Sequence, residues 1–503
     1  MKALLKRAIV PGLCSAALFL TGCSTIVTAH RQKAGIMANY VDGYQGAALA
    51  ELEYNLREPA WYNSSKVNTG DEVMWRVEAG ALNCLMGQDD KSIRHFERAE
   101  ELIEDFDERA MVNLREVGAE TSVLLTNPNA LPYRGWCRDR IMIPVFKAFS
   151  YLGKGDEQGF QTELFRLRTN QDAVMDKYEK FFEAEDKALA KEKEKNKTAA
   201  ASVNPDTVMK NPNNQEAGNA LNETNEAAHR GYANFLNPFS IFLSAYGYAR
   251  KNNYQNALVD CERLYKALPG NPLVKQYYVT CLLKTGRPVP GELQGVRPLD
   301  FSLGENNVLV IFANGRSAAL RQISLYIPII IPHYATVVLV AWPICEFYPA
   351  PYQPLDLAAD GKRYSTVKIA DMDGILAAEY TRRLPGMILR ICLSTAVKEI
   401  GAYMATRAAA KANGWAGLAT AIGTSAYKAT FNTADTRTWE ILPKEFQIAQ
   451  FAMPKDRKLV LGSDSGSPMT ITLPGTAGSA IVLINAPSPA PNAFTYRVFS
   501  LKN

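Results

Sequence analysis

Cys23 is the residue whose neighbours most clearly indicate chemistry. Three positive charges lie within the first seven residues, an apolar stretch runs from Ala8 to Leu20, and the small residues Thr21 and Gly22 precede the cysteine. This three-part order is typical of a secretory signal peptide. Small residues leave the peptide bond before a cysteine accessible to a protease, and a thiolate is a nucleophile that can be modified. We therefore predict that residues 1–22 are a signal peptide, cleaved between Gly22 and Cys23.

The sequence Leu20-Thr21-Gly22-Cys23 resembles the lipobox of bacterial lipoproteins, in which the thiol of the cysteine carries diacylglycerol. The resemblance implies that Cys23 is the lipidated first residue of the mature chain, and more than one acyl chain gives durable attachment. The apolar stretch is shorter than the roughly 20 residues of a spanning helix, and Pro11 interrupts it. Ser24, rather than Asp, favours the outer membrane, with the chain facing the periplasm. The alternative is an ordinary signal peptide with an incidental cysteine.

Other residues that could do chemistry favour structural roles. The chain has no Gly-x-Ser-x-Gly elbow, Walker loop or His-Glu-x-x-His motif. The segment Gly462-Ser-Asp-Ser-Gly466 is predicted to be a turn between strands rather than a nucleophile loop. Asp371 and Asp373 are predicted to lie in a solvated turn. Asp435 and Arg437, close to Trp439, could line a site, but a surface ion pair or a helix cap is favoured. We predict no catalytic residue.

Cysteine and histidine spacing gives no metal motif. Besides Cys14 and Cys23, six of the eight cysteines remain, widely spaced, and the four histidines form no ligand-spaced cluster. We therefore predict no metal site and no small-molecule cofactor. An exported chain could form Cys84–Cys137 or Cys261–Cys281 disulfides, or keep six buried thiols, and both possibilities stay open.

The overall charge excludes one class of partner. A net charge of +5 on 503 residues is slight and gives no concentrated basic face, so we predict no nucleic-acid binding. About 480 mature residues are enough for two or three domains. The predicted partners are the membrane, through the lipid, and an unidentified envelope protein.

Residues 23–285 are predicted to form an α-helical domain. Apolar residues recur at helical spacing in three helix–turn–helix units, near 73–106, 138–168 and 239–268. The third unit resembles a tetratricopeptide (TPR) repeat, with Ala245, Tyr254, Ala257 and Pro269 at the expected spacings. A generic helical domain is the alternative. Residues 176–200 are charge-rich and are predicted to form a solvated helix. Residues 201–220 are polar and rich in Asn and Pro, so we expect a flexible insert over about 186–220.

Residues 286–503 are predicted to be a mixed region. Short β-branched or alternating runs predict strands at 308–312, 323–327, 335–341, 367–369, 447–451, 458–461, 469–473, 480–484 and 496–500. The stretch 323–342 is almost wholly apolar, but its prolines favour strands over a membrane helix. An Ala-rich helix is expected over about 385–430, with Pro385 in its first turn. We expect it to pack on the sheet, and a membrane-lying helix is the alternative.

This order of segments resembles an uncharacterised family of Gram-negative lipoproteins with degenerate TPR-like helices. The residues that carry the resemblance are Asn307–Gly315, Asp435–Trp439, Leu442-Pro443 and Gln447–Ala449. The resemblance implies an α+β architecture and an envelope location, but no chemistry.

The sequence thus predicts a membrane-anchored adaptor or scaffold whose helical repeats bind a protein partner, since stacked repeats form concave binding surfaces. Two alternatives belong to other classes of protein. One is an envelope enzyme that acts on cell-wall glycan, and the other is a structural subunit of a secretion or export assembly.

Overall fold

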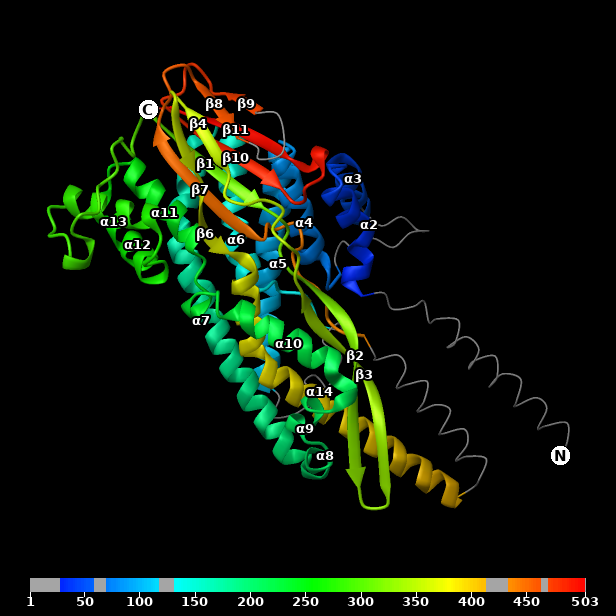
Figure 1. Cartoon of the computed structure of the whole chain (residues 1–503). Coiled ribbons are helices and arrows are strands. Elements are labelled where there is room, and N and C mark those ends of the chain that lie inside the picture. Colours follow the sequence, from blue (N-terminus) through cyan, green and yellow to red (C-terminus); the bar gives the residue numbers. More distant parts are fainter. Residues whose placement is uncertain (1–27, 58–68, 117–130, 413–432, 463–468, 503) are drawn as a thin grey trace.

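The computed structural model describes residues 28–57, 69–116, 131–412, 433–462 and 469–502 (Figure 1). Helix accounts for 56% and sheet for 19% of the structure, so the predicted α+β class is confirmed. The structure has a helical layer, two sheets stacked beside it, and a hairpin that projects from the body (Figure 1).

The N-terminal helices pack mainly against their neighbours in the chain, as the three predicted helix–turn–helix units require. Short turns join the paired helices, and Gly87, Gly155 and Asn252 in these turns have positive φ, a conformation that glycine and asparagine adopt most readily. The helices are α2 (Ala29–Val41), α3 (Gln45–Asn55), α4 (Glu72–Leu85), α5 (Asp89–Glu116), α6 (Cys137–Gly153), α7 (Glu157–Lys195), α11 (Pro238–Arg250), α12 (Tyr254–Ala267) and α13 (Pro272–Lys284).

The helix predicted over 176–200 is largely the C-terminal part of α7, but the flexible insert predicted over about 186–220 is wrong. α7 continues to Lys195, and short helices follow it before a longer one. The segment has few apolar residues, but these pack in a hydrophobic cluster: Val208 is fully buried and Ala217 is nearly so. Composition alone could not reveal that neighbouring elements supply the rest of the apolar surface. The elements are α8 (Lys197–Ala201), α9 (Pro205–Met209), η2 (Pro212–Asn214), α10 (Gln215–Ala228) and, beyond them, η3 (Ala233–Phe235).

A five-stranded sheet forms the centre, in the order β11-β10-β1-β7-β6. The middle strand β1 runs parallel to β10 and antiparallel to β7, and all its residues are buried. Because side chains alternate along a strand, Leu309 and Ile311 pack with the helices while Val308 and Val310 face a second sheet. The strands are β1 (Asn307–Asn314), β6 (Val367–Asp371), β7 (Glu445–Ala452), β10 (Ser479–Ala486) and β11 (Thr495–Leu501).

The second sheet has the order β5-β4-β8-β9 and covers the other face of the first. The strands predicted at 458–461 and 469–473 are its β8 and β9, whereas β4 and β5 were not predicted. Its members are β4 (Asp356–Ala359), β5 (Lys362–Ser365), β8 (Lys458–Leu461) and β9 (Met469–Thr472); the single-turn helices η4 (Gly291–Leu293) and η5 (Pro491–Ala493) lie in connecting segments.

The hairpin of β2 (Ala319–Ile331) and β3 (Tyr334–Glu346) is called the arm below. It projects from the body beside α8, α9, α10 and α14 (Figure 1). The proline-containing stretch at 323–342 is therefore a pair of strands, as predicted. One face of the arm, with Leu325 and Ile327, packs on α14 and on the 199–220 segment.

The predicted Ala-rich helix is α14 (Met372–Ala412). The predicted start at about 385 and the predicted place of Pro385 in the first turn are both wrong. It begins directly after β6, where the side chain of Asp371 accepts the backbone N–H of Gly374 at 2.9 Å and so caps the first turn. Pro385 lies inside the helix. Leu393 and Ala396 pack against the arm. The predicted extension to 430 lies outside the described residues.

The main hydrophobic core contains residues from both sides of the predicted boundary at 285, including Trp75 of α4, Phe239 of α11 and Phe499 of β11. Within the described ranges, no helix has the length and apolar character needed to cross a membrane.

Candidate functional site

The predicted lipid attachment residue Cys23 and the cleavage position at Gly22 lie outside the described residues. The described chain begins at Thr28, five residues after Cys23. The Thr28 hydroxyl accepts the backbone N–H of Arg31 and caps α2. The chain that follows the predicted anchor is thus part of the folded body from its first described residue.

Lys33 of α2 is a fully buried cation at the centre of a charged cluster. Its Nζ lies 2.8 Å from Oε1 of Glu78 on α4 and 2.9 Å from Oε1 of Glu440. It also donates to the carbonyl of Thr438 at 2.5 Å. Glu78 in turn accepts the backbone N–H groups of Glu440 at 2.8 Å and Ile441 at 3.0 Å. The cluster therefore joins α2 and α4 to the segment that leads into β7.

The charges in this cluster stabilise one another. Burial lowers the pKa of Lys33, but the carboxylates of Glu440 and Glu78 outweigh it and leave the pKa above its ordinary value. Burial raises the pKa of Glu440, but Lys33 and His30 outweigh it and leave the pKa below its usual range. We conclude that Lys33 and Glu440 are both ionised. Their burial keeps them from solvent, so the cluster is suited to holding segments together rather than to exchanging protons with a substrate.

Arg437 and Asp435 form an ion pair, as predicted, but the predicted surface location is wrong because Arg437 is buried. The Arg437 guanidinium contacts Asp435 at 2.7 Å and Asp71 at 3.0 Å, and it donates to the carbonyl of Leu131 at 2.9 Å. Burial raises the pKa of Asp435, but Arg437 more than offsets this and leaves it below its usual range. Trp439 is fully buried and lies between aromatic rings.

The predicted solvated turn at Asp371 and Asp373 is also wrong, since both residues are buried. Asp371 caps α14 and pairs with Arg230 at 3.1 Å. Asp373 accepts the backbone N–H of Ala318 at 2.7 Å and pairs with Lys444. These carboxylates fix the junction of β6, α14 and the base of the arm.

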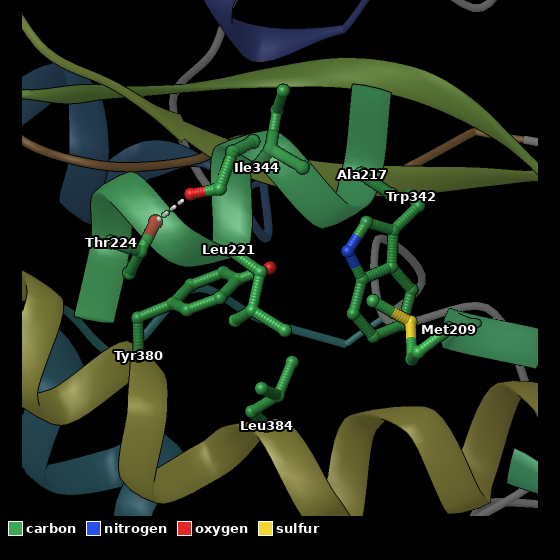
Figure 2. Close-up of a pocket in the computed structure, with 9 residues that line it drawn as sticks. Met209, Ala217, Leu221, Thr224, Trp342, Ile344, Tyr380 and Leu384 are labelled. Atoms are coloured by element: carbon green, nitrogen blue, oxygen red, sulfur yellow. Dashed lines mark hydrogen bonds between the residues drawn. The ribbon is translucent and has the colours of Figure 1, made fainter. Parts of the chain in front are cut away.

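A pocket lies between α9, α10, α14 and the arm (Figure 2). Its walls are mainly apolar, and two of its polar groups have partners within the protein: the Thr224 hydroxyl donates to the carbonyl of Ala220 at 2.7 Å, and the Tyr380 hydroxyl donates to the carbonyl of Pro343 at 2.7 Å. The space between these side chains has no room for a water molecule. Further wall residues are Met209, Leu221, Trp342, Ile344 and Leu384.

The six cysteines that follow Cys23 are all buried free thiols. Cys261 of α12 and Cys281 of α13 lie with their Sγ atoms 3.6 Å apart, whereas Cys84 donates to the carbonyl of Phe146. Within the part of the chain that the structure describes, no group of three His, Cys, Asp or Glu side chains could hold a metal ion. The serines of the Gly462–Gly466 segment lie outside that part.

The inner face of the third helix–turn–helix unit is occupied by the protein itself. Phe239 of α11 stacks on Phe446 of β7 with ring centroids 3.9 Å apart, and Tyr277 of α13 donates to Gln450 of β7. Twelve of the thirteen α11 residues are buried. A concave face on α11 is therefore not open to another protein.

Sequence reasoning did not single out Lys33, Glu78 and Glu440. One signal was available, because Glu78 lies inside the apolar stripe of α4, whose residues 72–84 are almost all buried. Glu440 is 362 residues away from Glu78, and no local spacing could have paired them.

Comparison of the chain with known protein families, with curated proteins and with solved structures finds no match. The resemblance to uncharacterised lipoproteins therefore stays a prediction.

Proposed function

We propose that this chain is a lipid-anchored lipoprotein of the cell envelope that acts as a protein-binding scaffold. The observation that carries the proposal is the Leu20-Thr21-Gly22-Cys23 sequence, which directly precedes a helix that Lys33 fixes in the core. Five residues from Cys23 to Thr28 can span at most about 18 Å. The anchor would hold the body close to the membrane, which we propose is the outer membrane on its periplasmic side.

We further propose that the three helix pairs are degenerate TPR-like repeats. Close contacts at small residues support this idea. A Cβ added to Gly80 of α4 would lie 2.8 Å from the ring of Phe96 on α5, and one added to Gly247 of α11 would lie 2.9 Å from Leu164 on α7. Small residues at such crossings are what close packing of repeat helices requires.

The partner would bind the outer surface of α12 and α13 rather than the inner face of α11, which β7 covers. Val259 on α12 and Leu283 on α13 have 48% and 53% of their surface exposed. Both are large apolar side chains exposed on well-packed helices, and a protein partner that covered them would remove apolar surface from water.

The anchor is tested by replacing Cys23 with Ser in the full chain. We expect the variant to lose incorporation of radiolabelled palmitate and to leave the membrane fraction or stay unprocessed. Unchanged labelling and processing would contradict the anchor.

The scaffold role is tested by affinity capture from detergent extracts. We expect a reproducible partner that is lost with Val259→Asp and Leu283→Asp together and kept with Val112→Asp, a matched control because Val112 on α5 is also 48% exposed. A specific partner that is insensitive to the double substitution would contradict this surface.

A structural subunit of an export assembly is a second candidate, favoured by the projecting arm. In that case the native mass of the solubilised protein would be that of an oligomer, and a monomer would argue against it.

A further inference from the structure

The arm presents an apolar face to solvent. The register pairs Ile330 with Ala335 and Pro328 with Val337, and these side chains point away from the face that packs on α14. Ile330 is 66% exposed and Val337 is 53% exposed. No Asp, Glu, Lys or Arg occurs from 322 to 345. An exposed apolar face on a projecting hairpin favours aggregation unless another surface covers it.

The direction of this outer face is fixed. The inner side chains, such as Ile327 and Ile329, are fully buried against the body. Along one edge of β2, the backbone N–H of Tyr326 donates to Oδ1 of Asn214 at 2.8 Å, and the N–H of Ile330 donates to the carbonyl of Ser202 at 3.0 Å. Since the arm is held on one side, it cannot turn its outer apolar face into its own core.

The predicted anchor lies close to the base of the arm. α2 contacts β2, and Nε2 of His30 lies 3.6 Å from Oε2 of Glu346, the residue that pairs with Ala319 where the two strands leave the body. A tether of five residues confines the lipid of Cys23 to within about 18 Å of Thr28. The arm itself extends about 40 Å from this base at 3.3 Å per residue.

We propose that the outer face of the arm lies on the surface of the lipid bilayer to which Cys23 tethers the chain. This inference rests on the proposed lipid anchor. The uncharged apolar face matches the boundary between headgroups and acyl chains, into which interfacial elements enter by about 5–10 Å. The arm lies on the bilayer rather than spanning it, because a two-stranded sheet leaves backbone groups unsatisfied in hydrocarbon.

A bilayer fits this face better than a protein partner does. The short tether brings every anchored molecule to a lipid surface. A protein interface usually adds a polar rim to its apolar centre, whereas the arm has no Asp, Glu, Lys or Arg from 322 to 345. Tyr326 adds an amphipathic ring of the kind that is enriched at membrane surfaces.

The test measures contact between the arm and lipid directly. The lipidated full chain is prepared with Val337→Cys, or with Val259→Cys as a matched control of similar exposure on α12, and is labelled with an NBD maleimide. The six native thiols are buried, so the label enters at the new cysteine. The protein is reconstituted in phosphatidylethanolamine–phosphatidylglycerol vesicles that carry doxyl-labelled lipid, and flotation of the vesicles reports the anchor separately.

We expect the NBD fluorescence at position 337 to be shifted to the blue and strongly quenched, and the fluorescence at position 259 to show neither change. Adding Ile330→Asp should abolish both effects at position 337 without a change in far-UV circular dichroism. If the protein floats with the vesicles but position 337 is not quenched, the arm does not contact lipid and the anchor still stands. If the protein does not float, both proposals are wrong. A dimer in detergent that Ile330→Asp abolishes, without lipid quenching, would identify a second copy as the occupant and overturn the inference.

Discussion

Replacing Lys33 with Met tests whether the buried charged cluster holds the N-terminal helices to the sheet. The Lys33 side chain has no exposed surface, and its Nζ contacts two carboxylates and one carbonyl at 2.5–2.9 Å. Methionine fills a similar volume but leaves Glu78 and Glu440 buried without their cation. Breaking a buried pair in this way costs about 3–5 kcal/mol, which is a large part of the stability of an ordinary domain.

The exposed pair of Lys266 and Glu262 provides a matched control. Its N···O distance of 2.7 Å is close to those of Lys33, but its side chains are 72% and 51% exposed, and such pairs on helices are worth about 0.3–0.5 kcal/mol. The assay is urea unfolding of the Cys23→Ser chain without its signal peptide, followed by circular dichroism. We expect Lys33→Met to lower the free energy of unfolding several times more than Lys266→Met.

A rescue variant separates lost charge from lost packing. Adding Glu78→Gln and Glu440→Gln to Lys33→Met removes the uncompensated charges, so we expect it to recover part of the stability at pH 7. In the single variant a buried carboxyl should take up a proton more readily when folded than when unfolded. The difference in the free energy of unfolding between Lys33→Met and the wild type should therefore become smaller as the pH falls from 7 to 5. Equal costs for Lys33→Met and Lys266→Met would refute the reasoning.

Three further predictions concern other buried groups. Burial and Arg76 lower the pKa of His95 to about 4, so between about pH 6.5 and 4 the unfolded chain binds a proton at this residue and the folded chain does not. The free energy of unfolding should therefore fall over this range by up to about 3 kcal/mol more in the wild type than in His95→Gln. Equal pH dependence of the two proteins in urea unfolding would contradict this. Under oxidised glutathione, Cys261 and Cys281 should lose two hydrogens and form a disulfide, seen as a mass change of about 2 Da that Cys261→Ser abolishes; an unchanged mass after prolonged oxidation would count against it. Val208→Asp should expose the 196–215 segment to limited proteolysis while the wild type resists, and cleavage of both at one rate would mean that the segment is not packed.

Local patterns predicted most of the elements. The β-branched run at 308–312 is the buried β1, and the helix pairs fall where the apolar spacing placed them. The missing strands, β4 and β5, have four residues each, and Lys362 and Arg363 give β5 little apolar character. β4 is defined by pairing with β8, and the edge strand β5 by pairing with β4, which sequence alone does not show.

The errors at charged and polar segments have one physical origin. Asp373 and Arg437 look solvated because charged residues usually are, yet each is buried beside a partner far along the chain, Lys444 for one and Asp71 for the other. The 199–220 segment was expected to be flexible for a similar reason, because its apolar partners lie on the arm and α14. Non-local pairing changes the environment of a residue without changing the local sequence.

The order of strands in the central sheet has a consequence for the timing of folding. β1 can form its hydrogen bonds in the sheet only after β7, which is made more than 130 residues later, and then β10 have been synthesised. The ion pair of Arg497 with Asp89, 408 residues apart, closes later still. Helix pairs can form as the N-terminal part emerges, but the central sheet cannot assemble until β7, β10 and β11 have been made, and such non-local pairing makes folding slow. A chain that stops short of β11 would therefore leave Phe499 and Leu501 out of the core, and we expect proteases to degrade it faster than a chain that contains this strand.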